Sequence, residues 1–287
     1  MINTSGWLSA GALTGSYPAS LPIPTGTVND RVTTTLYDAA GEAVATIDPE
    51  GNVTTTTYDG TGEAVSTTHY AVALTAAQRS ALGSAPTLAA LQADLTASSS
   101  NRTALTLYNA DGQAVAMVAA SGYVTLTSYN AAGEAVLSTA YATALTSSQL
   151  GSLGDTPTLA ALQADLTTSA QDQTTRTYYD GAGRVVAQID ADGYLTTTAD
   201  DETTDIATTT RYATALTSGQ LGALTGTETV ATLVGLLGSN TANETSSVTA
   251  NADGEVSSHT AVDGTVTTYT YNAAGQVLGT TITPTSG

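Results

Sequence analysis

The chain repeats itself every 71 residues, and this period constrains the fold more than any other feature. Tyr37-Asp38 returns as Tyr108-Asn109 and as Tyr179-Asp180. Such long-period similarity is typical of arrays in which each unit packs against the next. We therefore expect an N-terminal segment (1–30), three full units (31–101, 102–172 and 173–243) and a partial fourth unit (244–287). Two series of glycines keep the same register: Gly41, Gly112, Gly183 and Gly254, and Gly51, Gly122, Gly193 and Gly264.

A shorter period of 21 residues lies inside each unit and predicts β-hairpins. The motif Tyr37-Asp38-Ala-Ala-Gly41-Glu42 returns 21 residues later, beginning at Tyr58. Residues 32–37 before the motif are mostly β-branched or aromatic, and these side chains favour strands. Asp accepts backbone hydrogen bonds and Gly adopts positive φ, so the motif itself favours a tight turn. Two hairpins give four short strands per unit.

The remaining part of each unit, about 30 residues, predicts two short helices. Thr75 and Gln78 have the spacing of a capping box at a helix start, and Gly83 follows as a helix end. Leu88, Leu91 and Leu95 then form one apolar stripe. Helices this short are unstable alone and must pack on other elements. The predicted fold is a β-rich (α+β) repeat, a solenoid-like array of β-hairpins with a short helical hairpin in each 71-residue unit. The capping box recurs at Thr146…Gln149 and Thr217…Gln220, and the helix-ending glycine at Gly154.

Composition excludes several functional classes. The chain has 25 acidic and 6 basic residues, all of the latter Arg, and a formal net charge of −19. Such a chain cannot neutralise a run of phosphates, so we expect no nucleic-acid partner. The absence of Cys and Lys removes disulfides, thiolate metal sites, P-loops and Schiff bases. No stretch approaches the length of a membrane span, and residues 1–15 lack the basic start of a Sec-type signal.

The pattern Tyr-Asp-x-x-Gly-Arg, followed by Asp-x-x-Gly and a Thr-rich strand, resembles the Rhs/YD-repeat family. The copy that matches best begins at Tyr179-Asp180 and includes Gly183-Arg184. This resemblance implies curling β-sheet strips found in large secreted or surface proteins of bacteria, including toxins whose strip closes around an effector. The chain departs from the pattern because Glu or Gln replaces the Arg elsewhere, and the helical segments are additional. An extracellular or bacterial cell-surface location follows from the resemblance.

Candidate chemical sites are few. His69 and His259 are the only histidines, and neither recurs at the period. The segment Asp190-Ala-Asp192-Gly193 is similar to a fragment of a calcium loop, so weak Ca²⁺ binding at acidic turns is an alternative to a plain turn. We expect no catalytic, cofactor or metal residues and no enzymatic activity. Tyrosines recur with the hairpins and suit cross-strand packing, or else a carbohydrate platform: Tyr37, Tyr58, Tyr108, Tyr129, Tyr179 and Tyr271.

The two ends suggest how the chain could act. Residues 1–30 and the partial unit 244–287 together come close to one period, and neither end looks like a polar cap. We therefore expect residues 1–30 to be an assembly arm in a head-to-tail oligomer, the subunit of a surface filament or matrix fibre. One alternative is a stalk segment of a large adhesin that contacts cell-surface carbohydrate or protein. A second is a fragment of an Rhs-type toxin shell.

Overall fold

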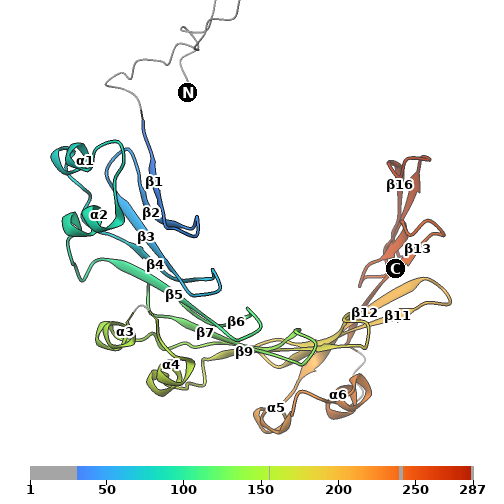
Figure 1. Ribbon diagram of the computed structural model, residues 1–287. Helices are drawn as coiled ribbons and strands as arrows, with labels where there is room; N and C mark the ends of the chain where they lie inside the picture. Colours follow the sequence, from blue (N-terminus) through green and yellow to red (C-terminus); the bar gives the residue numbers. More distant parts are fainter. Residues whose placement is uncertain (1–30, 155, 239–241, 286–287) are drawn as a thin grey trace, which may run out of the picture. The chain divides into compact units, whose positions relative to one another are not determined.

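The computed structural model describes residues 31–154, 156–238 and 242–285. Sixteen strands pair in the order in which they occur along the chain, so the predicted β-rich fold is confirmed (Figure 1). Four strands followed by two helices occur three times, and four further strands follow. The expected assembly arm, 1–30, lies outside the described residues. No helix of the described part is long and apolar enough to cross a membrane.

The bounds of the elements follow the repeat. The first set contains β1 (Thr34–Tyr37), β2 (Ala43–Ile47), β3 (Val53–Tyr58), β4 (Ala64–His69), α1 (Ala76–Leu82) and α2 (Leu88–Asp94). The second contains β5 (Arg102–Tyr108), β6 (Ala114–Val118), β7 (Val124–Tyr129), β8 (Ala135–Ala140), α3 (Ser147–Leu153) and α4 (Leu159–Asp165). The third contains β9 (Gln173–Tyr179), β10 (Val185–Ile189), β11 (Tyr194–Asp201), β12 (Ile206–Ala215), α5 (Ser218–Ala223) and α6 (Val230–Leu237). The fourth contains β13 (Glu244–Ala250), β14 (Val256–Thr260), β15 (Val266–Tyr271) and β16 (Val277–Thr283).

The chain divides into two compact units. The smaller comprises Met1–Thr54 and Val72–Thr96, and the larger comprises Thr55–Ala71 and Ala97–Gly287. The described part of the smaller unit therefore holds β1, β2, the start of β3, α1 and α2, and the larger unit holds the remaining elements.

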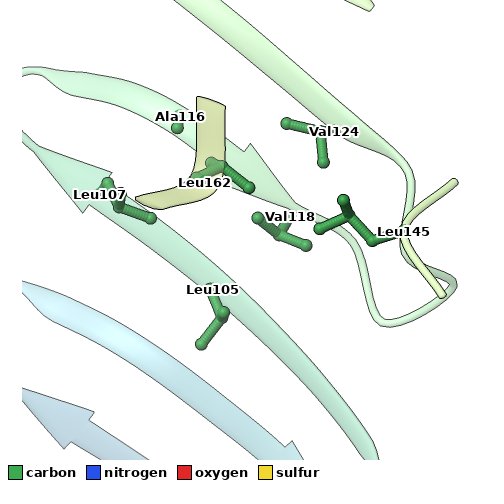
Figure 2. Packing of buried hydrophobic residues seen from close by; sticks show 7 residues of the cluster. All are labelled: Leu105, Leu107, Ala116, Val118, Val124, Leu145 and Leu162. Carbon is green, nitrogen blue, oxygen red and sulfur yellow. The ribbon is translucent and has the colours of Figure 1, made fainter. Parts of the chain in front are cut away.

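In the second and third sets, the helical pair covers the strands of its own set. In the second set, the fully buried Leu162 of α4 packs on Leu107, Ala116 and Val118 of β5 and β6 (Figure 2). These strand residues alternate with half-buried or exposed ones, as expected for a sheet with one covered face. The third set repeats the arrangement with Leu233 of α6 on Ala187, Ile189 and Leu195. Deeply buried leucines thus supply the stability that the short helices lack alone.

A glycine on the opposite edge from the Tyr-Asp turns ties each helical segment to the sheet. The Leu145 amide, just before α3, donates to the Gly122 carbonyl at 2.9 Å. Gly122 has a φ of +86°, and a Cβ there would lie 2.6 Å from the Leu145 carbonyl oxygen. The same bond joins Leu74 to Gly51 at 2.8 Å. Glycine is needed here for both its positive φ and the close approach of the two backbones.

The predicted caps of the first helix in each pair are confirmed. Thr75 accepts from the Gln78 amide while the Gln78 side chain accepts from the Thr75 amide. Gly83 ends α1 with a φ of +70°. The third set differs at this end, because Leu224 with an extended backbone follows α5. The capping box also forms at Thr146 and Thr217, and Gly154 ends α3.

The inner face of the sheet, which the helical pairs cover in the second and third sets, is more polar in the fourth set. Thr249, Ser258 and Thr260 occupy the positions of Leu107, Ala116 and Val118 in the second set. All three are only half-buried. This face therefore lacks the apolar surface that holds a helical pair in the other sets.

Candidate functional site

The Tyr-Asp motifs form a set of turns that we name the turn edge, comprising residues 38–42, 59–63, 109–113, 130–134, 180–184, 251–255 and 272–276. In each turn the first and fifth residues are joined by a backbone hydrogen bond, as from the Asp38 amide to the Glu42 carbonyl at 3.0 Å. The side-chain oxygen of the first residue accepts from the third and fifth amides, for example from Ala40 and Glu42 at 2.9 Å. The predicted turns are thus confirmed, and their Asp or Asn residues have a structural function.

In five of these turns the first and fifth side chains also bind each other; these turns begin at Asn109, Asn130, Asp180, Asn251 and Asn272. Arg184 donates to the Asp180 carboxylate at 2.8 Å, which explains why the repeat pattern pairs these residue types. Where Asn and Glu together replace Asp and Arg, the direction of this bond reverses, whereas the turns that begin at Asp38 and Asp59 carry a carboxylate at both positions. The amide of Asn130 donates to the Glu134 carboxylate at 2.6 Å. Asp–Arg and Asn–Glu pairs therefore close the same turn with the donor and the carboxylate at exchanged positions.

The aspartates at the first position of these turns, Asp38, Asp59 and Asp180, have lowered pKa values. The hydrogen bond from the Arg184 backbone amide is the first cause for Asp180, followed by the bond from the Arg184 side chain. For Asp38 the main cause is the Glu42 backbone amide. For Asp48, in the turn between β2 and β3, it is the side-chain amide of Asn52. Such shifts arise from turn geometry and do not indicate acid–base chemistry.

Neighbouring turns in the larger unit touch one another. The Gln113 side chain donates to the Gly133 carbonyl at 3.1 Å. A Cβ on Gly112 would lie 2.6 Å from the Glu63 carboxylate, and one on Gly183 would lie 2.9 Å from that of Glu134. The fifth side chain of one turn therefore rests on the glycine of the next, which stacks the hairpins along the turn edge.

The recurring tyrosines bind the backbone across the sheet. The Tyr129 hydroxyl donates to the Ala114 carbonyl at 3.1 Å, and the Tyr179 hydroxyl donates to the Ala135 carbonyl at 3.1 Å. A register shift occurs beside the tyrosine in most of these hairpins, as at Ser128/Tyr129. Half-buried rings with bound hydroxyls support cross-strand packing as the role of these tyrosines. Tyr37 differs because it is 65% exposed.

The other candidate residues do not come together. His69 ends β4 opposite Arg102, and His259 lies in β14 opposite Val248 and Thr267. In the strand order they are ten strands apart. Asp190 accepts from the amides of Asp192 and Tyr194 and pairs with Arg211 at 3.4 Å. Within the described ranges, no group of three His, Cys, Asp or Glu residues could hold a metal ion. The turn alternative therefore accounts for Asp190 without Ca²⁺.

The sequence did not predict two polar features of the structure. Burial raises the pKa of the Tyr178 hydroxyl to about 12, and its bond to Glu228 adds to this. Burial opposes ionisation of Glu228, but hydrogen bonds led by the Thr225 backbone amide lower its pKa to about 2. The second feature is Arg79, whose Nε is buried without a hydrogen-bond partner among the described residues. Alignment of the units would have found Arg79, because leucines occupy its position in the next two units (Leu150 and Leu221).

Arg79 lies beside a small open groove in the smaller unit. The groove has a volume of about 150 Å³, and Val32, Ile47, Leu82 and Pro86 contribute its apolar lining. The Arg79 guanidinium donates to the Pro49 carbonyl. Thr34, Asp48 and Arg79 add polar groups to the lining, but the groove is smaller than the usual small-molecule site.

Comparison with known proteins identifies the repeat. The sequence model of the family RHS Repeat matches residues 37–71 and 251–287. The resemblance to Rhs/YD repeats is thereby confirmed for these two stretches, which match the Rhs repeat. No curated protein matches the chain.

Solved structures share the fold. The crystal structure of TcdB2-TccC3-TEV matches with a TM-score of 0.55 at 16% identity, over 88% of this chain and 10% of the other. The structure of TcdB2-TccC3 gives 0.54 at 15% identity, over 87% and 10%. That of TcdB2-TccC3-Cdc42 gives 0.53 at 15% identity, again over 87% and 10%. At this identity the likeness shows a common β-rich repeat fold, and this chain spans about a tenth of those chains.

Proposed function

We propose that the protein is a non-enzymatic, extracellular structural repeat protein, the subunit of a head-to-tail surface filament or matrix fibre. The observation that supports this most directly is the exposure of large apolar side chains on both end strands. Val277, Leu278 and Ile282 of β16 are 54–69% exposed, and Tyr37 of β1 is 65% exposed. Contiguous exposed apolar residues on an edge strand favour pairing with another chain.

The distribution of titratable groups supports a structural role. The aspartates with lowered pKa values accept hydrogen bonds within turns, and Glu228 serves the fold of the third set. Asp48 lines the groove beside Arg79, but its carboxylate already accepts from the backbone and side-chain amides of Asn52. The strongly acidic surface would keep the fibres soluble. Composition and the Rhs resemblance support an extracellular or cell-surface location, and residues 1–30 are the assembly arm in this proposal.

The likeness to TcdB2-TccC3 structures favours a second candidate, a segment of a larger Rhs-type shell. Negative-stain microscopy and sedimentation velocity, each over a range of concentrations, distinguish the two. A filament subunit forms long uniform fibres, and its weight-average mass rises with concentration. A shell segment remains as single short particles of constant mass, and this result would refute the filament.

A further inference from the structure

Three strand pairs inside the larger unit show how one four-strand set joins the next. They are β4 with β5, β8 with β9 and β12 with β13, all antiparallel. Each pair contains a threonine hydroxyl contact, at 2.8 Å for Thr68 and Thr103 and at 3.1 Å for Thr139 and Thr174. The first pair places Thr67 opposite Ala104 and Ser66 opposite Leu105. These internal junctions define one repeated register.

Two of these junctions, β4–β5 and β8–β9, are also closed at the turn edge by two further contacts. At β12–β13, Ala250 takes the place of the tyrosine, and no described atom lies within 4 Å of a Cβ built on Gly254. The hydroxyl of the first strand's tyrosine donates to the carbonyl that opens the preceding strand, as in Tyr179 to Ala135 at 3.1 Å. The fifth side chain of the preceding turn rests on the next turn's glycine, as Glu63 does on Gly112. A junction of this kind thus uses a strand edge, a tyrosine and a glycine in fixed positions.

β1 presents the corresponding positions without these partners. Tyr37 takes the place of Tyr108 and Tyr179 but is exposed. Gly41 takes the place of Gly112, yet no described atom lies within 4 Å of where its Cβ would be. Val32, next to the strand, is 66% exposed.

β16 presents the complementary positions. Within the 71-residue register, Val277 corresponds to Ala64, whose carbonyl accepts the Tyr108 hydroxyl, and Gln276 corresponds to Glu63. Leu278 and Ile282 are exposed on the same strand. β16 carries no charged residue, and neither does β1. Pairing the two strands would therefore bring no acidic side chains together, despite the net charge of −19.

Resting on the proposed function, we infer that β16 of one copy pairs antiparallel with β1 of the next copy, in the register of the internal junctions. Thr280 then faces Thr33 and Gly279 faces Thr34, as Thr67 faces Ala104 and Ser66 faces Leu105. The Tyr37 hydroxyl donates to the Val277 carbonyl of the other copy, and Gln276 rests on its Gly41. The occupant of the exposed β1 edge is therefore a second copy of this chain.

This junction differs from the internal ones in ways that make it reversible. The Asn101 side chain accepts from the Ala71 amide beside the first internal junction. Pro284 stands at the position of Ala71 and has no amide proton to donate. Val32 replaces the threonine that contacts Thr68, so one hydroxyl contact becomes apolar. The half-polar inner face of the fourth set also directs the contact to the strand edge, because that face has little apolar surface to bury.

Cysteine cross-linking tests the register, since the chain contains no cysteine. Two single variants, Thr33→Cys and Thr280→Cys, are mixed under oxidised glutathione and analysed on a non-reducing gel. The inference requires a disulfide-linked heterodimer, and the double variant in one chain should give a ladder of multimers. A chain with both Thr67→Cys and Ala104→Cys calibrates the reaction, because those residues face each other at an internal junction. Mixing Thr33→Cys with Ile282→Cys moves the pair out of register and should give at least tenfold less heterodimer.

A charge variant tests the same surface without cysteine. Leu278→Asp with Ile282→Asp should lower self-association at least 30-fold, because two exposed apolar side chains on the junction become repelling carboxylates. Met117→Asp is the matched control, since Met117 is 57% exposed on the internal strand β6. Circular dichroism confirms that each variant keeps the fold.

The results of these experiments distinguish failure of the inferred β16–β1 junction from failure of the proposed filament function. Fibres that form without the Thr33–Thr280 cross-link would overturn the junction alone and leave the filament standing. A monomer at every concentration would overturn both. Absence of the intermolecular cross-link would also result if residues 1–30 of the same chain cover β1, and this result counts against the inference.

Discussion

Replacement of Gly122 by Ala should detach the helical pair of the second set from the sheet. Gly122 has a φ of +86° and accepts from the Leu145 amide at 2.9 Å. The new Cβ would lie 2.6 Å from the Leu145 carbonyl oxygen, 3.3 Å from its nitrogen and 3.4 Å from its carbonyl carbon. These are backbone atoms, so the chain before α3 must move for the methyl group to fit.

The expected cost can be worked out from three contributions. Positive φ costs a non-glycine residue about 1–2 kcal/mol. Loss of the backbone hydrogen bond costs about 1 kcal/mol. Partial exposure of Leu145, which is now 6% exposed, costs at least about 1 kcal/mol more. The sum is about 3–4 kcal/mol for the stability of the second set.

Gly133→Ala is the matched control within the same set. Gly133 has a φ of +85°, almost the value of Gly122, and also closes a tight turn. The nearest atom to its new Cβ is the end of the flexible Gln113 side chain, at 3.0 Å. The control should therefore cost only the 1–2 kcal/mol of the backbone conformation.

Hydrogen exchange measures the difference locally, which suits a repeat array in which cooperativity between units can be incomplete. The Leu145 amide should lose protection by a factor of at least about 30 in Gly122→Ala relative to Gly133→Ala, because about 2 kcal/mol separates them. Equal loss of protection in both variants would refute the argument. It would mean that the glycine is needed for its φ alone and not for the close approach of Leu145.

Three further predictions concern single side chains. Glu228→Gln should lower the free energy of unfolding by about 1–2 kcal/mol at pH 7, once solvent screening is allowed for. Because the pKa of Glu228 in the folded protein is about 2, the wild-type chain should have its full advantage above pH about 4.5 and lose it as the pH falls towards 2. Urea titrations across this pH range would measure the difference. Arg79→Leu should stabilise the smaller unit by about 1–2 kcal/mol, because it removes a buried, unpartnered Nε and restores the leucine of the other units, and an unchanged or lower denaturation midpoint would contradict this. Arg184→Glu should lower the thermal midpoint, because it removes the ion pairs of Arg184 with Asp180, Asp200 and Glu202. Adding Asp180→Asn should recover part of the loss by recreating the Asn–Glu pair, and the absence of any recovery would show that the two side chains do not act together.

The sequence alone predicted the strands, the turns and the capped helices, because each depends on residues close together in the chain. Asp38 and Gly41 determine their turn by local hydrogen bonding and φ, and Thr75 with Gln78 determines the start of α1. The period also predicted which residues are equivalent. Contacts between distant segments could not be obtained in this way. The bond from Leu145 to Gly122 and the pair of Tyr178 with Glu228 depend on how the chain returns to the sheet.

The departures from the Tyr-Asp-x-x-Gly-Arg pattern bear on where function can reside. Glu134 in place of the pattern's arginine is accompanied by Asn130 in place of aspartate, and the pair still closes the turn. The exchange conserves the hydrogen bond while moving charge from an internal ion pair to a single exposed carboxylate. Such compensation is expected of residues retained for folding, and it accounts for Glu134 and Glu255. The first-position aspartates hold their turns through backbone hydrogen bonds instead. Specific recognition must then use side chains that the fold leaves exposed, and Tyr37, Leu278 and Ile282 on the end strands meet this condition.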